Sequence, residues 1–361
     1  GRKPHWEWWT VSARKLRVGI VGCGVIAPLH AESYRLADGV EITWACDLVE
    51  EKARRLAEKY GIAHVTTDYR EVTAAADVDC ISVCTDHASH SPITVAALDD
   101  GKHVLCEKAL AASPAGLDAM FAAHARRPEL AFGGVFQHRF DQDVQLLKRL
   151  VEDGSLGDLL TAGVQIRCWR SPDYYRADRW RGTWAEEGGA VLINQAIHFI
   201  DALLWIVGGA RAVNGVYANL THGDSMETED TAVATLKFAG GALGILEATC
   251  SSHLSWEPTL SLHGTRGSID LRGGLPLKVR FTDEATAKRI EQELAECDRA
   301  MKVAAGKRHY GTTHPELIAD FVEAIRTGRQ PFVTAQSARH AVDVVLGIYQ
   351  SHRSGSWVDL A

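Results

Sequence analysis

Short apolar runs alternate with stretches of helical length through the first third of the chain. Six such runs precede residue 136, and they are residues 16–21, 41–46, 64–66, 80–84, 103–106 and 131–135. Helices are expected between these runs. The first follows residue 27 and ends at about residue 37, and the others cover residues 50–60, 68–75, 91–99 and 114–125. This alternation predicts a parallel, doubly wound sheet that binds its ligands at the carboxyl ends of the strands.

The second half follows a different pattern, in which turn-like breaks rather than helices separate most of the strand-like segments. The expected strands are residues 160–169, 214–222, 231–238, 242–250, 259–263 and 268–271, with a hairpin turn over 238–242. They predict a largely antiparallel sheet with helices on one face. Residues 190–208 predict a buried helix with a polar stripe, and residues 283–305 predict a charged, inserted helix with a solvated face.

A glycine-rich turn follows the first apolar run at once. Gly22-Cys23-Gly24-Val25-Ile26-Ala27 matches the pattern G-x-G-x-x-A, placed between a strand and a helix. The first glycine permits a tight turn, the second admits a pyrophosphate to the backbone, and the small Ala27 allows close packing of helix on strand. We therefore expect a dinucleotide cofactor to contact Gly22, Gly24, Val25, Ile26 and Ala27.

An acidic residue ends the second strand. Asp47 lies 20 residues beyond Ala27, where a carboxylate can accept hydrogen bonds from the adenosine ribose and repel a 2′-phosphate. This position favours NAD over NADP. The alternative is that Asp47 only caps the following helix, residues 50–60.

The length of 361 residues exceeds what one hydrophobic core usually supports. We expect an α/β Rossmann dinucleotide-binding domain plus an α+β domain with a large, mostly antiparallel open sheet. Residues 1–14 would be an N-terminal extension, 15–136 the NAD-binding domain, and 137–361 the substrate-binding and dimerisation domain. The final helix is placed to pack back on the first domain.

Charge and cysteine usage exclude several classes of protein. The net charge of −7 offers no basic surface for nucleic acid or anionic lipid, and no apolar run is long enough to cross a membrane. The eight cysteines lack disulfide or zinc spacing and are expected to be reduced, buried thiols of a cytoplasmic protein. No metal site is expected, because no histidine pair has ligand spacing on a predicted helix.

The first 14 residues are basic and rich in tryptophan, without the apolar stretch of a secretory signal. A remnant of preparation, a clipped terminus and an arm packed on a partner subunit all remain open for them.

Polar side chains collect at the carboxyl ends of the last three expected strands of the first domain. Asp86 follows the fourth strand. The residues from which we expect cofactor contacts are Thr85, His90, Glu107, Lys108 and Gln137. Arg139 lies just beyond Gln137, near the expected nicotinamide end, and is expected to contact cofactor or substrate.

Several spaced motifs resemble one family. They are the strand end Glu107-Lys108, the segment from Thr85 to His90, the turn Gly188-Gly189-Ala190, and the helix 194–201 with His198. The hairpin 264–267 and His314, near the end of the chain, follow in the same order as the corresponding motifs of that family. Together they resemble the Gfo/Idh/MocA oxidoreductases, the family of glucose–fructose oxidoreductase and inositol dehydrogenase, over about residues 16–360. Two departures are Ala109 for the proline of Glu-Lys-Pro and Asn194 for the first acid of the helix motif.

The resemblance implies that Lys108 reaches the reacting hydroxyl. Asn194 and His198 are four residues apart on the expected helix and share one face. The family acid orients the histidine, and Asn194 supplies no negative charge, so either His198 is a weaker base or Lys108 carries more of the proton transfer. Glu107 and Lys108 are expected to point to opposite faces of their strand.

An aromatic and arginine-rich segment, residues 168–184, precedes the catalytic helix. Aromatic faces stack on a pyranose and arginines bind its hydroxyls, so the substrate candidates there are Arg170, Tyr174, Tyr175, Trp180 and Arg181. The alternative is a loop pinned on a partner subunit. Further expected substrate contacts are Lys108, Arg139, Asn194, His198 and His314, with His253 and Trp256 as outer candidates.

The expected function is an NAD-dependent oxidoreductase that transfers hydride between a secondary hydroxyl of a sugar, sugar derivative or cyclitol and the nicotinamide. We expect a homodimer or homotetramer that pairs through the open sheet face, with no nucleic-acid or membrane partner. Two alternatives stay open: an enzyme that keeps its NAD and oxidises a sugar transiently to cleave or epimerise it, and a non-catalytic NAD-binding regulatory protein.

Overall fold

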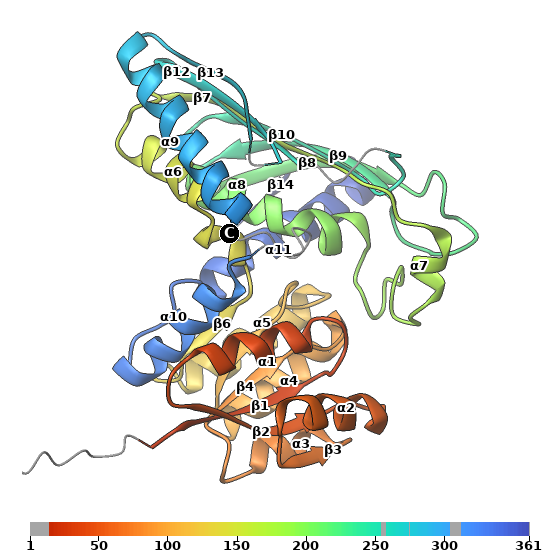
Figure 1. The fold of residues 1–361 in the computed structure, drawn as a ribbon. Coiled ribbons are helices and arrows are strands. Elements are labelled where there is room, and N and C mark those ends of the chain that lie inside the picture. Colours follow the sequence, from red (N-terminus) through yellow and green to blue (C-terminus); the bar gives the residue numbers. More distant parts are fainter. Residues whose placement is uncertain (1–13, 254–257, 274, 304–311, 361) are drawn as a thin grey trace, which may run out of the picture.

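The computed structural model describes residues 14–253, 258–273, 275–303 and 312–360. Figure 1 shows two sheets, one in the lower and one in the upper half of the molecule, each covered by helices. The expected fold class is confirmed, with a parallel sheet first and a large, mostly antiparallel sheet second. Of the expected N-terminal extension only Arg14 belongs to the described residues, and Trp256 lies outside them.

The first sheet has six parallel strands in the order β3-β2-β1-β4-β5-β6. They are β1 Leu16–Val21, β2 Val40–Cys46, β3 His64–Thr66, β4 Cys80–Val83, β5 His103–Cys106 and β6 Phe132–Gly134. Their runs are continuously apolar because helices cover both faces of the sheet. The strand order reverses between β1 and β4, so the carboxyl ends of these strands border the crevice where such sheets bind ligands.

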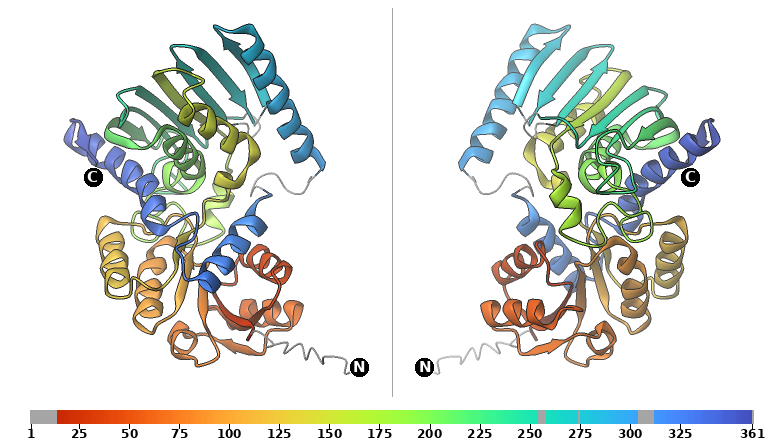
Figure 2. Two further views of the ribbon diagram at one scale, coloured as in Figure 1. Left: turned by 90° about the vertical axis from the view of Figure 1, so that its left-hand side faces the viewer. Right: turned by 90° about the vertical axis from the view of Figure 1, so that its right-hand side faces the viewer.

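Five helices connect these strands. They are α1 Ala27–Leu36, α2 Glu50–Tyr60, α3 Tyr69–Ala74, α4 His87–Asp99 and α5 Pro114–Arg126. Figure 2 shows α1 and α2 on one side of the sheet and α4 and α5 on the other. Helix α4 begins four residues before its predicted start at Ser91, because the side chain of Asp86 accepts a hydrogen bond from the backbone of Ser89 and caps the helix.

The second sheet has eight strands in the order β13-β12-β11-β7-β10-β9-β8-β14. They are β7 Leu159–Arg167, β8 Ala210–Ala218, β9 Thr231–Phe238, β10 Leu243–Thr249, β11 Thr259–Gly264, β12 Gly267–Arg272, β13 Leu275–Phe281 and β14 Val358–Asp359. Only β7 and β10 pair in parallel within this described sheet.

Two strands of this sheet were not predicted, and one was misplaced. Strand β13 is an edge strand whose side chains are mostly exposed; its apolar residues do alternate, at Leu275, Leu277, Val279 and Phe281, and this signal was overlooked. Strand β14 is two residues long and exists because it pairs with Val213 and Ala212 of β8. The predicted span 214–222 was wrong at both ends, because β8 begins at Ala210 directly after the glycines that end the preceding helix.

Helices cover one face of the second sheet. The helices of this half are α6 Gln142–Glu152, α7 Pro172–Arg176, α8 Ile197–Val207, α9 Glu284–Val303, α10 His314–Thr327 and α11 Ala335–Ser354. Figures 1 and 2 show α6, α8 and α9 on the same side of the strands.

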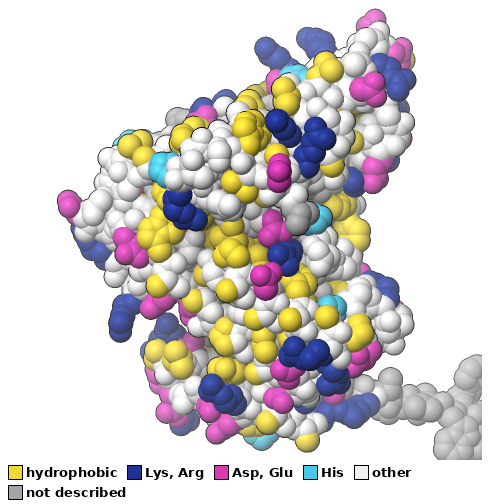
Figure 3. Space-filling view, turned by 180° about the vertical axis from the view of Figure 1, so that it is seen from behind, with side chains coloured by type: hydrophobic (Ala, Val, Ile, Leu, Met, Phe, Trp, Pro, Cys, Tyr) yellow, Lys and Arg dark blue, Asp and Glu magenta, His cyan; other side chains and the backbone are white. Residues whose placement is uncertain are grey.

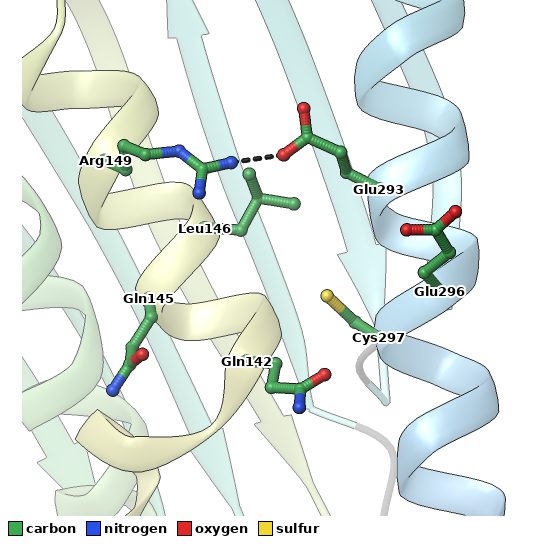
Figure 4. Close-up of a pocket in the computed structure, with 7 residues that line it drawn as sticks. All are labelled: Gln142, Gln145, Leu146, Arg149, Glu293, Glu296 and Cys297. Atoms are coloured by element: carbon green, nitrogen blue, oxygen red, sulfur yellow. Dashed lines mark hydrogen bonds and ion pairs between the residues drawn. The ribbon is translucent and has the colours of Figure 1, made fainter.

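Helix α9 is the charged helix expected as an insertion. It buries Ile290 and Leu294, while its outer side chains stay in solvent. An ion pair between Arg149 of α6 and Glu293 of α9 crosses a groove of about 460 Å³ between the two helices (Figure 4). The prediction of a solvated face therefore holds only for the outer side of α9, because its inner side packs on the protein.

The opposite face of the second sheet is uncovered among the described residues. Leu243 and Ile245 of β10 are about 60% exposed there, with Val216 and Val233 beside them. Figure 3, which views the molecule from behind, shows hydrophobic side chains across its upper half.

The C-terminal helices join the two halves. Helix α10 packs on α1, and α11 contacts both β6 and the second-sheet strand β8. Gly133 of β6 forms an isolated bridge with Thr334, and the backbone of Phe132 donates to the side chain of Gln330. The edge of the first sheet is thus completed by residues from the end of the chain.

All eight cysteines are buried and unpaired. Across the described residues, no helix combines the length and the apolar character needed to cross a membrane.

Candidate active site

The glycine-rich turn leaves β1 at the point where the strand order reverses. Gly22 has a φ of +93°, and a Cβ there would lie 2.4 Å from the carbonyl oxygen of Cys84. Only glycine therefore allows the ends of β1 and β4 to come this close, which brings Thr85 beside the turn. Val25 is 70% exposed, and Ala27, which begins α1, is fully buried.

Asp47 fastens this turn to the end of β2. Its carboxylate accepts hydrogen bonds of 2.8 Å from the backbone N–H groups of Cys23 and Val49. Helix α2 has no side-chain cap, so the alternative of Asp47 as its capping residue is not what the structure shows. The carboxylate is half-buried at the open edge of the crevice.

The glycine turn, the N-terminus of α1 and Asp47 fit a dinucleotide. No atom would meet a Cβ at Gly24, which leaves its backbone open to a phosphate. Gly22, Gly24, Val25, Ile26 and Ala27 would hold the pyrophosphate, and Asp47 would face the adenosine ribose.

Glu107, at the end of β5, is buried against His30 of α1. Oε1 lies 2.8 Å from Nε2 of His30, whose Nδ1 lies 3.2 Å from the hydroxyl of Ser82. Burial alone would raise the pKa of Glu107, but its hydrogen bond with His30 lowers that pKa to about 2. Glu107 is thus a buried charged group that fixes β5 to α1, and the cofactor contact expected from it stays a prediction.

Lys108 points the other way from the strand, as expected. Its Nζ donates to the side-chain oxygen of Asn194 at 2.7 Å and to the backbone carbonyl of Asn194 at 2.9 Å. Burial lowers the pKa of Lys108; Glu107 and Glu187 oppose this effect, and Arg170 and Arg181 add to it. The peptide bond from Lys108 to Ala109 is cis.

His90 was expected to contact the cofactor. It is fully buried, and its Nδ1 and Nε2 lie 2.7 and 3.2 Å from the carbonyl oxygens of Ala109 and Thr85. Both ring nitrogens therefore face backbone carbonyls, and the neutral imidazole can donate a hydrogen bond to one of the two. The expectation is corrected: His90 supports the strand ends from beneath.

Asn194 lies in a π-helical turn, Val191–Ala196, that precedes α8, rather than in the regular α-helix that was expected. The buried carboxylate of Glu229 holds this turn, because it accepts from the backbone of Ala190 and Leu192 and from the hydroxyl of Tyr349. A Cβ on Gly189 would lie 2.0 Å from that hydroxyl, so glycine is required before the turn.

His198 faces the same region as Lys108. Its Nδ1 is buried and has no hydrogen-bond partner among the described residues. Burial lowers the pKa of His198 well below its ordinary value, and Lys108, His138 and His314 reinforce the shift. The lowered pKa keeps the imidazole neutral, with one ring nitrogen free of a proton, and makes it a weaker base than an ordinary histidine.

His314 opens α10 and is likewise buried, with its Nδ1 unpartnered in the described part of the chain. Its ring lies 6.2 Å from that of His30, and burial lowers its pKa to about 4. Gln137, in the 3₁₀ turn Gln137–Phe140 after β6, is buried, and its backbone carbonyl accepts a hydrogen bond from the hydroxyl of Thr313.

The residues of the aromatic and arginine-rich segment 168–184 differ in burial and in the side chains they contact. The guanidinium carbons of Arg181 and Arg170 lie 4.1 and 5.1 Å from the centre of the Tyr174 ring, and both arginines influence the pKa of Lys108. Trp180 is half-buried against the ring of His87. The guanidinium carbon of Arg181 also lies 5.6 Å from the centre of the Trp180 ring, so these four side chains form one group near Lys108.

Three other expected contacts are placed differently. Tyr175 is buried, with its hydroxyl 3.1 Å from the sulfur of Cys250. Arg139 is buried in an ion pair with Asp201, and its remaining donors reach Ser337. His253 stacks on Trp169 at an exposed position. Tyr175 and Arg139 are therefore engaged in contacts within the protein, and the substrate contacts expected from them stay predictions.

Sequence reasoning missed two buried partners of the site. His30 lies in the helix after the glycine turn, where its apolar surroundings gave no sign of a charged partner. Glu187 precedes the two glycines of the 188–190 turn, and its side chain accepts a 2.5 Å hydrogen bond from the Nδ2 group of Asn194. The acid directly before Gly-Gly was the available signal.

A glycine turn with an acid behind it and a lysine held at the end of β5 define a dinucleotide-binding oxidoreductase. The models of the two domains of one oxidoreductase family match this chain, the NAD-binding Rossmann fold over residues 16–134 and the C-terminal alpha/beta domain over residues 148–360. The chain belongs to the Gfo/Idh/MocA oxidoreductase family.

Relatives with assigned activities match along most of their length. Myo-inositol 2-dehydrogenase of Thermotoga maritima is 26% identical over 338 residues, covering 91% of this chain and 93% of that protein. D-glucoside 3-dehydrogenase of Escherichia coli is 27% identical over 374 residues, covering 97% and 99%. The crystal structure of the WlbA dehydrogenase of Bordetella pertussis with NADH and UDP-GlcNAcA is 25% identical with a TM-score of 0.87, covering 97% and 99%.

Proposed function

We propose that this protein is an NAD-dependent dehydrogenase that oxidises a secondary hydroxyl of a sugar, sugar derivative or cyclitol. The observation that carries the proposal is Lys108, held by Asn194 at the carboxyl end of β5 on the side of the crevice that His198 also faces. The dehydrogenases that match the chain act on cyclitols and glucosides, which supports this substrate class.

The proposed chemistry divides between cofactor and protein. A bound nicotinamide supplies the hydride acceptor. Lys108 positions the reacting hydroxyl and, when neutral, accepts its proton, since burial favours the neutral amine. His198 is the second proposed acceptor, because its imidazole is half-buried, neutral and within electrostatic reach of Lys108. Lys108, His198 and Asn194 are thus the proposed catalytic group.

The proposed pocket follows from the same grouping. Arg170, Tyr174, Trp180 and Arg181 offer an aromatic face and guanidinium donors near Lys108, and His314 is a further proposed substrate contact. Two guanidinium groups also fit an acidic substituent, so uronates belong among the substrates to be tried.

We propose NAD rather than NADP as the cofactor, because the Asp47 carboxylate beside the glycine turn would repel a 2′-phosphate on the adenosine ribose. Thr85, Glu107, Lys108 and Gln137 line the strand ends toward the proposed nicotinamide site, with Glu107 acting through its buried contacts.

The decisive experiment is a dehydrogenase screen over free sugars, anhydrosugars, glycosides, uronates and inositols, with NAD and NADP side by side. We expect reduction of NAD with at least one sugar or cyclitol. Tight NAD binding without reduction by any compound of this panel contradicts the proposal, and a preference for NADP contradicts the role given to Asp47.

For the assembled protein, we propose a homodimer or homotetramer that pairs through the uncovered face of the second sheet. The exposed apolar residues Leu243, Ile245, Val216 and Val233 support this face as the contact. Ile245→Lys should lower the mass in light scattering, from a dimer to monomers or from a tetramer to dimers, and an unchanged mass contradicts the proposed face. The unpaired thiols support a reducing, cytoplasmic compartment.

A further inference from the structure

Glu187 is a buried carboxylate that is linked to the proposed proton acceptor, Lys108, through one intervening side chain, that of Asn194. Lys108 donates to the oxygen of the Asn194 side chain, and the Nδ2 group of the same amide donates to Oε1 of Glu187 at 2.5 Å. An ammonium group can only donate, so it fixes the amide with its oxygen toward Lys108 and its nitrogen toward Glu187. The three side chains form one directed chain of hydrogen bonds.

The position of Glu187 is fixed from both domains. Its Oε2 accepts from the backbone of Gly182, and its carbonyl oxygen accepts from the ring of His87 at 2.8 Å. The neighbouring carbonyl of Glu186 accepts from the backbone of Ala88, also at the start of α4. The side chain itself is fully buried. A carboxylate held this firmly has little freedom to reorient when the amide or the lysine changes its proton.

We propose that Glu187 is a positioning residue for proton transfer, supplying to Lys108 through the Asn194 amide the negative charge that an acid at position 194 would supply directly. The inference rests on the proposed function, since it treats Lys108 as the proton acceptor. Glu187 touches neither substrate nor cofactor in this scheme. It sets the orientation of the Asn194 amide and favours the ammonium form of Lys108.

Other charges that act on the same groups are also in place. Lys108 is influenced by Glu107, Glu187, Arg170 and Arg181, and it in turn influences His87 and His198. Glu187 has Glu229 as a like-charged neighbour, and it influences Tyr174, Tyr175 and Tyr349. Burial raises the pKa of Glu187 to about 7 against its hydrogen bonds from Gly182 and Asn194. The carboxylate is therefore the dominant form above that pH.

The test compares four variants with the wild type: Glu187→Gln, Asn194→Asp, the double variant with both changes, and Glu186→Gln as a matched control at the exposed neighbour. Glu187→Gln removes the charge and turns one amide N–H toward the Gly182 N–H. In the double variant, the new amide at position 187 can donate to the new carboxylate at position 194 and accept from Gly182. Every hydrogen bond is then restored with the charge moved to position 194.

The first readout needs no substrate. The protonation midpoint of Lys108 is measured by NMR of lysine labelled at Cε, with the signal assigned by its loss in Lys108→Ala. We expect Glu187→Gln to lower this midpoint by about one pH unit, and both proteins that carry Asn194→Asp to raise it, because an anion favours the ammonium form. Glu186→Gln should leave it unchanged.

The second readout is turnover with the sugar or cyclitol found in the screen. We expect Glu187→Gln to lower kcat about 10- to 100-fold with KM changed less, and the double variant to recover most of the loss. The rising limb of the kcat–pH profile should move to lower pH in Glu187→Gln and to higher pH in the double variant.

Different results would overturn the proposed role of Lys108 and the positioning role of Glu187. Full turnover by Lys108→Ala overturns the proton-acceptor role itself. An unmoved Lys108 midpoint in Glu187→Gln, with losses of kcat that only follow losses of Tm, shows a purely structural Glu187 and overturns the inference. If Glu187→Gln does not fold, the double variant decides: a Lys108 midpoint at or below that of the wild type overturns the inference, and a higher one supports it.

Discussion

Two buried carboxylates influence the pKa of Lys108 from opposite domains, and their surroundings differ in kind. Glu107, on the Rossmann side, shares a hydrogen bond with the imidazole of His30, and its pKa is lowered to about 2. Glu187, on the side of the second sheet, accepts only from an amide and a backbone N–H, and burial raises its pKa to about 7. Burial acts on both groups in the same direction, so the titratable partner accounts for the difference.

This contrast separates two tasks within one site. Glu107, which stays ionised at every physiological pH, exerts a constant electrostatic effect on the pKa of Lys108 and fixes β5 to α1. A carboxylate that titrates near neutrality gives a contribution that depends on pH. Both carboxylates act on the charge state of Lys108. The following substitutions test whether Glu107 and Glu187 act on it independently.

The largest effect is expected from removing the lysine on which both carboxylates act. Lys108→Ala should lower kcat by about three orders of magnitude or more, because both the positioning of the hydroxyl and one proton acceptor are lost. NADH affinity, measured by fluorescence titration, should change little, since the glycine turn and Asp47 remain. Lys278→Ala, at an exposed lysine of β13, serves as the control and should match the wild type. Retention of most of the wild-type kcat would exclude Lys108 as the proton acceptor.

The Rossmann side should respond mainly in stability. Because the pKa of Glu107 is lower in the folded protein than in the unfolded chain, its ionisation contributes about 2–4 kcal/mol to the free energy of unfolding at pH 7. This contribution is present above about pH 4.5 and declines as the pH falls toward 2. Urea unfolding of Glu107→Gln and wild type should therefore differ most at pH 7 and converge below pH 4. A constant difference across this range argues against an ionised Glu107.

The second-domain side should show the opposite slope. The pKa of Glu187 is higher in the folded protein than in the unfolded chain, so the folded state binds its proton more tightly and loses stability as pH rises from about 4.5 to 7. Wild type should lose about 1–3 kcal/mol more than Glu187→Gln between pH 5 and 8. The same urea experiment measures it, with Glu186→Gln expected to follow the wild type. Equal slopes in all three proteins would show that Glu187 does not titrate there.

The smallest effects come from two adjacent tyrosines that sharpen the boundary of the site. Tyr175→Phe removes a buried hydrogen bond to Cys250 and should cost about 1 kcal/mol of stability without changing KM. Tyr174→Phe leaves the ring beneath the guanidinium groups and should cost less stability but raise KM severalfold. Initial rates and thermal unfolding measured on both variants decide it; a KM change confined to Tyr175→Phe would place the pocket elsewhere.

The sequence predicted the local features of this site and missed its long-range partners. The glycine turn and Asp47 follow from spacing along strands and helices, whereas the roles predicted for Lys108, Asn194 and His198 came from the family resemblance. The pairing of Glu107 with His30 joins residues 77 positions apart on different elements, and no local pattern marks it. Tyr175 and Tyr174 are indistinguishable in composition, and only the turn of α7 sends one toward Cys250 and leaves the other beneath the guanidinium groups.

The fold shows the same limit. Strands with alternating burial, such as β9 and β10, were predicted within a residue or so, because their pattern reflects one covered and one open face. Strand β14 has two residues and is defined only by its pairing with β8. The π-helical turn at Asn194 depends on Glu229 and Tyr349, which are distant in sequence from it and from each other.

The bridge between Gly133 and Thr334 sets an order of events during synthesis. Residues 16–134 leave the ribosome first, yet the edge of β6 is bridged only by a segment made about 200 residues later. At ordinary translation rates the nascent first domain waits roughly 10–40 s with that edge unpaired. A chaperone that binds exposed strand edges would have its main opportunity in this interval, and a transcript cut short before residue 334 would yield a first domain that keeps the edge exposed.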